Sequence, residues 1–207
     1  MATPVVLTAA VEGLVDEVLL KRICSSVGVS VGQVYGRYGK SYILARLNGY
    51  NHSAQFRHWV VLVDLDDDSI CVPEVLPQWL PAPSRLMRLR VAVRELEAWL
   101  LADTERIAKF LAVPVAEIPA DPDRVADPKR LMVQLARSSR RRAIREDMVP
   151  NIGSGQQVGP AYTSRMIEFI QSVESGWRPN VAAGNSDSLR RCISAISNLA
   201  GQEFDPR

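Results

Sequence analysis

The stretch Trp59-Val-Val-Leu-Val-Asp64-Leu-Asp66 decides the fold of this chain. Its first five residues are apolar and rich in valine, which is typical of a short strand buried within a sheet. The apolar run passes directly into Asp64, so the strand is expected to end on a carboxylate. We therefore predict a buried strand over 59–63 with an acidic turn behind it.

Strands and helices are expected to alternate on both sides of this stretch. Apolar runs and residues at helical spacing place further strands at 4–11, 29–35 and 89–93, and helices at 14–27, 42–47 and 95–111. Four prolines between Pro73 and Pro83 mark a connection. This order predicts an α/β fold whose mostly parallel sheet has helices on its faces.

The second half of the chain changes character. Prolines punctuate a loop region that begins at Pro114, and only helices are expected beyond it, at 128–137, 163–175 and 188–199. We therefore expect an α/β core over 1–112 and a helical C-terminal extension over 113–207 that packs on this core.

Composition is ordinary for a soluble globular protein and leaves the partners open. Of 207 residues, 47% are hydrophobic and 23% charged, and the net charge is +2. That net charge hides a segregated distribution: five acidic residues and no basic one stand between Asp64 and Glu74, and eight basic residues and one acidic stand between Arg124 and Arg145. Three widely spaced cysteines and two histidines without ligand spacing argue against a disulfide framework or a zinc site. With no signal segment and no long apolar stretch, the protein is expected to be cytoplasmic, with no membrane contact.

Carboxylates follow two strands of the predicted sheet. Glu12 comes after the first strand, and Asp64 and Asp66 come after the third. Because the carboxyl ends of parallel strands share one edge of the sheet, these side chains are expected to converge there. Three carboxylates repel one another unless a cation lies among them, and Mg²⁺, or Mn²⁺ in its place, prefers oxygen ligands.

We therefore predict a catalytic metal site at this edge, with one or two ions. A carboxylate that is not fully engaged by metal is also suited to proton transfer. The predicted metal ligands are Glu12, Asp64, Asp66 and Asp68. Lys40 is predicted to direct its charge at a phosphate of the substrate.

The acidic stretch has other interpretations. A calcium-binding EF-hand loop needs glycine at its sixth position and glutamate at its twelfth, where this chain has Ser69 and Val75. A P-loop ending in Lys40 and Ser41 would need glycine where Val34 stands. A solvated acidic turn and a sugar-nucleotide transferase with an Asp-x-Asp metal motif stay open.

At this point the sequence resembles a known family. Glu12-Gly13-x-x-Asp16 after one strand, followed by Asp64-x-Asp66 after a later one, is similar to the TOPRIM domain of primases, topoisomerases and overcoming-lysogenization-defect nucleases. The resemblance implies a TOPRIM-like, Rossmann-like fold, an acid–base or metal role for Glu12, and magnesium binding by the aspartate pair. The segments Glu95–Asp103 and Asp127–Lys129 also resemble small bacterial TOPRIM-related proteins of unassigned function.

Three further acidic residues are candidates for a second metal or for shaping the site: Asp16, Glu95 and Glu97. Glu95 is expected at a strand end, on the same edge as Glu12 and Asp64. Glu97 lies in the first turn of the predicted helix, where the helix dipole stabilises an acid by about 0.3–1 kcal/mol and gives a structural reason for its presence.

A basic segment is the candidate nucleic-acid contact. Arginine clusters suit phosphate backbones through charge and forked hydrogen bonds, although a solvated helix end or a protein-docking patch has the same composition. No aromatic residue is interleaved in this segment, which argues against base stacking as its main mode of binding. The predicted contact residues are Lys129, Arg130, Arg137, Arg140, Arg141 and Arg142.

Two functions compete. The first is a divalent-metal-dependent nuclease that hydrolyses phosphodiester bonds of DNA or RNA. Because TOPRIM nucleases commonly work beside an ABC-type ATPase, the resemblance implies a separate ATPase partner within a phage-defence or toxin-like unit. The second is a non-catalytic regulatory or binding subunit that docks onto such an ATPase. Either is compatible with a homo-oligomer.

Overall fold

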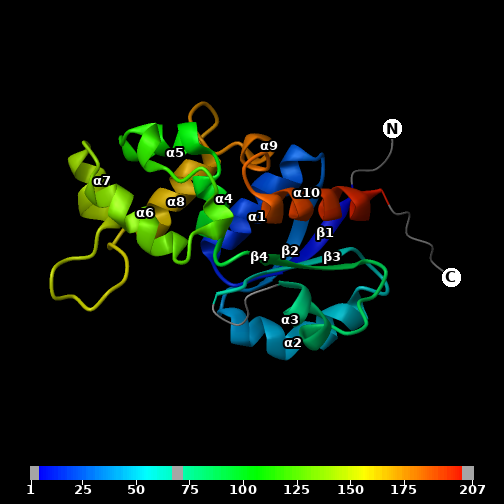
Figure 1. Cartoon of the computed structure of the whole chain (residues 1–207). Helices are drawn as coiled ribbons and strands as arrows, with labels where there is room; N and C mark the ends of the chain where they lie inside the picture. Colours follow the sequence, from blue (N-terminus) through cyan, green and yellow to red (C-terminus); the bar gives the residue numbers. More distant parts are fainter. Residues whose placement is uncertain (1–4, 67–71, 202–207) are drawn as a thin grey trace. The chain divides into compact units, whose positions relative to one another are not determined.

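The computed structural model describes residues 5–66 and 72–201, which Figure 1 traces. The chain divides into two units: one contains the residues up to Val93 together with those from Arg190 on, and the other is the continuous segment Arg94–Leu189. This division differs from the expected one, in which a core over 1–112 precedes an extension over 113–207.

The first unit is built on a four-stranded sheet. Its strands, β1 (Val6–Val11), β2 (Ser30–Gly36), β3 (Trp59–Asp64) and β4 (Met87–Ala92), pair in the order β2-β1-β3-β4. Every pair is parallel. The apolar run of β3 is buried and has a neighbouring strand on each side, as its composition predicts. The predicted α/β fold with a parallel sheet is confirmed.

Helices cover both faces of this sheet. In sequence, α1 (Leu14–Ser26) follows β1, α2 (Lys40–Ser53) follows β2, and α3 (Val72–Trp79) follows β3. Figure 1 shows α2 and α3 on one face, and α1 on the other together with α10 (Asp187–Ala200), which belongs to the first unit from Arg190 on. This arrangement places the helix that begins at Lys40 beside the strand that ends at Asp64.

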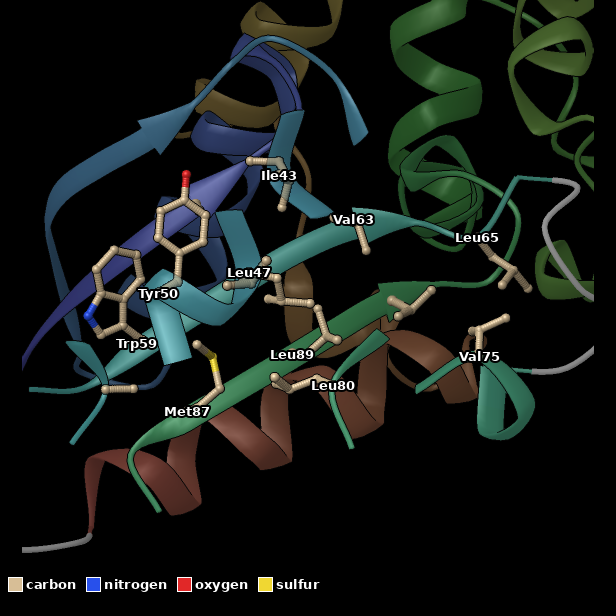
Figure 2. Close-up of a cluster of buried hydrophobic side chains, with 14 residues drawn as sticks. Ile43, Leu47, Tyr50, Trp59, Val63, Leu65, Val75, Leu80, Met87 and Leu89 are labelled. Atoms are coloured by element: carbon tan, nitrogen blue, oxygen red, sulfur yellow. The ribbon is translucent and has the colours of Figure 1, made fainter. Parts of the chain in front are cut away.

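The core between the sheet and α2 fixes the position of that helix. Figure 2 shows this cluster, which includes Ile43 and Leu47 from α2 and Trp59 and Val63 from β3. Full burial of apolar side chains of this size stabilises the folded state by about 1.5–3 kcal/mol each. With α2 fixed in this way, its first residue, Lys40, is held at one end of the sheet.

The connection between β3 and β4 contains a helix, α3, that the proline-rich sequence did not predict. The sequence marks this segment only as proline-rich, whereas the structure forms α3 with two of the prolines inside it. Pro73 is the second residue of the helix, where its missing N–H has no helical partner to lose. Pro77 lies in the last turn, so it removes one bond of a helix that is about to end.

In the second unit the described residues form helices, turns and loops and no strand. Two short 3₁₀ helices, Val115–Glu117 and Pro122–Arg124, lie between its second and third α-helices. The α-helices that begin in this unit are α4 (Leu96–Leu101), α5 (Thr104–Leu111), α6 (Pro128–Arg137), α7 (Arg142–Met148), α8 (Tyr162–Gln171), α9 (Pro179–Ala182) and α10.

The helix expected over 95–111 is divided in two at Ala102 and Asp103. Asp103 precedes α5, and its fully buried carboxylate accepts hydrogen bonds from Arg178. The buried Trp99 in α4 also belongs to this unit: its indole N–H donates to Ser188, and its carbonyl accepts from the indole of Trp177. These contacts tie α4 and α5 to the helices that follow in the second unit.

Among residues 5–66 and 72–201, no helix combines the length with the apolar character needed to cross a bilayer. The longest helices have 14 residues, α2 and α10, and each carries charged side chains.

Candidate functional site

The carboxylate of Glu12 meets the end of β3. Glu12 follows β1, which pairs in parallel with β3 so that Val11 stands opposite Leu62. One carboxylate oxygen of Glu12, Oε1, accepts a hydrogen bond from the backbone N–H of Asp64 at 2.8 Å. The structure therefore brings together the two strand ends that the sequence singles out.

Lys40 holds the turn that follows β3. Its ammonium lies 2.5 Å from Oδ2 of Asp66 and donates to the carbonyl oxygens of Asp64 and Leu65 at 3.1 and 3.2 Å. The Lys40 side chain is only 14% exposed. Asp66 itself has a φ of 49°, a left-handed conformation that Asp adopts more readily than most residues. The predicted catalytic lysine and the second aspartate of the motif are thus direct partners.

The loop before Lys40 is fixed against the end of β1. The backbone N–H of Gly39 donates to the carbonyl of Glu12 at 3.1 Å, and that of Arg37 donates to the carbonyl of Val11 at 2.8 Å. Gly36 has a φ of 93°, and a Cβ there would collide with the backbone of Val11. Glycine at this position therefore allows the close approach that puts Lys40 beside Glu12.

The Glu12 carboxyl has a pKa well above that of an ordinary glutamate. The pKa of Glu12 is raised from 4.5 to about 7, chiefly by burial and also by the nearby carboxylates of Asp16 and Asp66, while the Asp64 N–H and the Lys40 ammonium oppose the shift. Asp16 lies in the first turn of α1, close enough to Glu12 for its charge to raise the pKa of that carboxyl. A carboxyl with such a pKa gains and loses protons near neutral pH.

Among the described residues, the predicted ligands Glu12, Asp64 and Asp66 do not form a three-ligand metal group. Within residues 5–66 and 72–201, no three His, Cys, Asp or Glu side chains are grouped so as to hold a metal ion. The predicted ligand Asp68 lies outside the described residues. Magnesium commonly binds through one or two carboxylates and completes its shell with water and substrate phosphate, so Asp64 and Asp66 have the appropriate chemistry.

A second polar cluster lies within the second unit and contains Glu95, Glu97, Lys129 and Tyr162. Lys129 donates to Glu95 through both its ammonium, at 2.7 Å, and its backbone N–H, at 2.9 Å. The hydroxyl of Tyr162 donates to Oε1 of Glu97 at 3.1 Å, and the Lys129 ammonium lies 3.8 Å from the same oxygen. These contacts tie the starts of α4, α6 and α8 together.

The cluster bears on what the sequence predicted for Glu95, Glu97 and Lys129. Glu95 is not at a strand end, because β4 ends at Ala92 and Glu95 directly precedes α4. Glu97 is explained by its hydrogen bond to Tyr162 as well as by its place in the first turn. Lys129, a predicted nucleic-acid contact, forms an ion pair with Glu95. The sequence offers no signal for Tyr162, which lies 65 positions from its partner.

Glu97 gives the protein a pH dependence of stability that can be measured. Burial raises the pKa of Glu97 from 4.5 to about 7, although Lys129 opposes the shift. The folded protein therefore binds this proton more tightly than the unfolded chain does. The resulting stabilisation is present below pH 4.5 and is lost as the pH rises to about 7, by at most about 3 kcal/mol.

Glu97→Gln is expected to remove most of this dependence, since glutamine keeps an acceptor for Tyr162 but does not titrate. Urea unfolding at pH 5, 6.5 and 8 would measure the free energy of unfolding of both proteins. Glu12 is unchanged in the variant, so its own contribution cancels in the comparison. Glu117→Gln, which alters an exposed acid of the same unit, is the matched control. An equal decline in both proteins would contradict the assignment.

Most of the predicted nucleic-acid contacts lie on the surface of α6, α7 and the turn between them. Arg142 forms an exposed ion pair with Glu146 at 2.7 Å, one helical turn further on. The exposed basic residues of this segment are Arg130, Arg137, Arg140, Arg141 and Arg142. Their exposure leaves them accessible to a phosphate backbone.

The chain was compared with family models, with curated proteins and with solved structures, and none of the three comparisons found a match. The contacts that join Glu12, Lys40, Asp64 and Asp66 are therefore the basis for inferring a function.

Proposed function

We propose that this protein is a divalent-metal-dependent phosphodiesterase that hydrolyses DNA or RNA and has a TOPRIM-like fold. The observation that carries the proposal is the meeting of Glu12, Lys40 and the Asp64–Asp66 turn at one edge of the parallel sheet. Hydrolysis of a phosphodiester needs oxygen ligands for a metal, a cation for the phosphate and a group that exchanges protons. This edge supplies all three kinds of group.

Strand order supports the TOPRIM-like part of the proposal. Glu12 follows β1, and the Asp-x-Asp pair follows β3, the strand next to β1 in the sheet. The two motifs that resemble the TOPRIM domain therefore stand side by side in space, as a shared site requires. The parallel sheet with helices on both faces is a Rossmann-like arrangement.

Each residue has a distinct role in the proposed reaction. Asp64 and Asp66 are the protein ligands of Mg²⁺ or Mn²⁺, which when bound polarises the phosphate and lowers the pKa of a bound water. Glu12 exchanges a proton with the attacking water or the leaving oxygen. Lys40 forms an ion pair with Asp66 in the structure. In the proposed reaction its ammonium leaves Asp66 and contacts a phosphate oxygen of the substrate.

Nucleic acid is the proposed substrate because of the exposed arginines of α6 and α7. Forked guanidinium groups contact phosphates without regard to base sequence, so this surface suits a backbone and carries no base specificity of its own. A separate ABC-type ATPase, within a phage-defence or toxin-like unit, is part of the proposal through the resemblance alone.

One observation favours the competing function, a non-catalytic subunit that docks onto an ATPase. Lys40 already neutralises Asp66 and bonds two carbonyl oxygens of the same turn, as a purely structural lysine would. In that case the ion pair stabilises the turn and no metal replaces it. The two functions differ in their response to metal.

Metal-dependent cleavage distinguishes them. Plasmid, single-stranded DNA and tRNA are each incubated with the protein in Mg²⁺, Mn²⁺ or EDTA. We expect cleavage with metal, none with EDTA, and a loss of at least about 100-fold in Asp64→Asn, because a lost ligand removes several kcal/mol of transition-state stabilisation. Asp121→Asn, an exposed acid of the second unit, is the matched control. No cleavage of any substrate, also with an ATPase partner and ATP added, would favour the binding subunit.

A further inference from the structure

An exposed tyrosine stands next to the candidate catalytic edge. Tyr38 is 76% exposed and lies in the loop between β2 and α2. Its two neighbours in sequence, Arg37 and Gly39, bond through their backbone N–H groups to the carbonyls of Val11 and Glu12. The ring is therefore attached to a backbone that is fixed directly against the end of β1.

The Tyr38 ring packs against the ring of Tyr42 in α2. Its centroid lies 4.9 Å from that of Tyr42, and the guanidinium of Arg46 lies 3.6 Å from the Tyr42 centroid. Tyr42 and Arg46 are one turn apart on the same side of α2, and the buried face of α2 holds that helix on the sheet. Two aromatic rings and a guanidinium thus form a supported surface, which we call the Tyr38 platform (Tyr38, Tyr42, Arg46).

The sequence that carries the platform is basic. From Val18 to Val63 it has no acidic residue and six lysines and arginines, of which Lys21 and Arg37 form ion pairs with Glu17. Arg46 is exposed, and Lys40 lies two residues after Tyr38 with its ammonium at the Asp64–Asp66 turn. Aromatic rings among basic side chains are the combination that binds single-stranded nucleic acids, in which bases stack on rings and cations contact the backbone.

We propose that the Tyr38 platform binds an unpaired nucleotide of a single-stranded nucleic acid, whose base stacks on the ring of Tyr38 while Arg46 contacts a neighbouring phosphate. The inference rests on the proposed function in that the bound strand is the substrate of the Glu12 site. A duplex does not fit this contact, because its bases are already stacked on one another and present only their edges in the grooves.

Equilibrium binding tests the proposal without cleavage. Fluorescence anisotropy is measured in EDTA with a short fluorescein-labelled DNA strand, its RNA counterpart, and the same DNA strand annealed to its complement. Tyr38→Ala is expected to weaken binding of the single strands on the order of 10-fold and to leave duplex binding unchanged. Tyr38→Trp and Tyr38→Phe keep a ring and should retain the affinity, whereas Tyr38→Leu should behave like alanine.

Phe56→Ala provides the matched control, since Phe56 is a 62% exposed aromatic residue of the same unit that follows the far end of α2. Its single-strand affinity should equal that of the unaltered protein. Because Tyr38 is exposed, Tyr38→Ala should also keep the thermal unfolding midpoint.

Several results would overturn the inference: no binding of either single strand, equal loss for single strand and duplex, or full affinity in Tyr38→Ala or Tyr38→Leu. These experiments test the platform and the proposed nuclease activity separately. If single strands bind through Tyr38 but no substrate is cleaved with metal, the platform stands and the nuclease does not. If strands are cleaved and Tyr38→Ala changes neither affinity nor KM, the nuclease stands and the platform does not.

Discussion

Glu12→Gln is expected to reduce kcat for cleavage by about 10²–10⁴-fold, the range associated with loss of a general acid or base. Glutamine has the same shape as glutamate, and its carbonyl oxygen can still accept the 2.8 Å hydrogen bond from the Asp64 N–H. The turn after β3 should therefore keep its geometry. What the variant loses is proton exchange, so the affinity for nucleic acid in EDTA should stay unchanged.

Single-turnover cleavage with Mg²⁺ measures this effect apart from substrate binding. Glu74→Gln removes an exposed carboxylate from α3 in the same unit and should cleave at the unaltered rate. Glu12→Asp keeps a carboxyl but withdraws it by one methylene, and an intermediate rate is expected. A Glu12→Gln rate within tenfold of the original would show that Glu12 does not carry the proton.

Arg178→Ala is expected to lower the free energy of unfolding by about 3–5 kcal/mol, because it leaves a buried carboxylate without its counter-ion. The Asp103 carboxylate has no exposed surface and accepts from Arg178 three times, from Nη2 at 2.6 Å, from the backbone N–H at 2.9 Å and from Nε at 3.0 Å. Alanine keeps only the backbone bond. The remaining charge stays in the interior, where no water solvates it.

The cost should fall when the charge is removed as well. In Asp103→Asn combined with Arg178→Ala, the buried group is neutral, and the double variant should be more stable than Arg178→Ala alone. Glu105, whose side chain is 75% exposed, also contacts Arg178 at 3.0 Å, and Glu105→Ala should change stability by at most about 1 kcal/mol. Urea unfolding followed by circular dichroism measures all three. Equal losses in Glu105→Ala and Arg178→Ala would contradict the role given to Asp103.

The sheet and its carboxylate edge could be predicted because both depend on local sequence. A buried apolar run such as Trp59–Val63 has few alternatives to a strand, and parallel strands necessarily end at a common edge. The meeting of Glu12 with Asp64 follows from those two facts. Lys40 could be suspected only from its place after a glycine loop, and its ion pair with Asp66 required the register of α2 on the sheet.

Contacts between distant residues could not be predicted. Glu95 and Lys129 are separated by 34 positions, and Asp103 and Arg178 by 75, with no periodic pattern to connect them. The helix α3 was not predicted because proline is typical of loops. Proline is nevertheless tolerated in the first turn of a helix. Part of the Tyr38 platform had a signal in the sequence: Tyr42 and Arg46 are four residues apart, the spacing of a helix face, and Tyr38 precedes them in the loop before α2.

The interrupted first unit has a consequence for the order of folding during synthesis. Residues 94–189 are translated between β4 and the part of α10 that belongs with the sheet. Until that part emerges from the ribosome, the sheet lacks the buried side chains of Cys192, Ile196 and Leu199. The second unit, by contrast, is one uninterrupted segment, and all its residues have been translated before the last part of the first unit. The half of the protein that is translated first is therefore completed after the half that follows it.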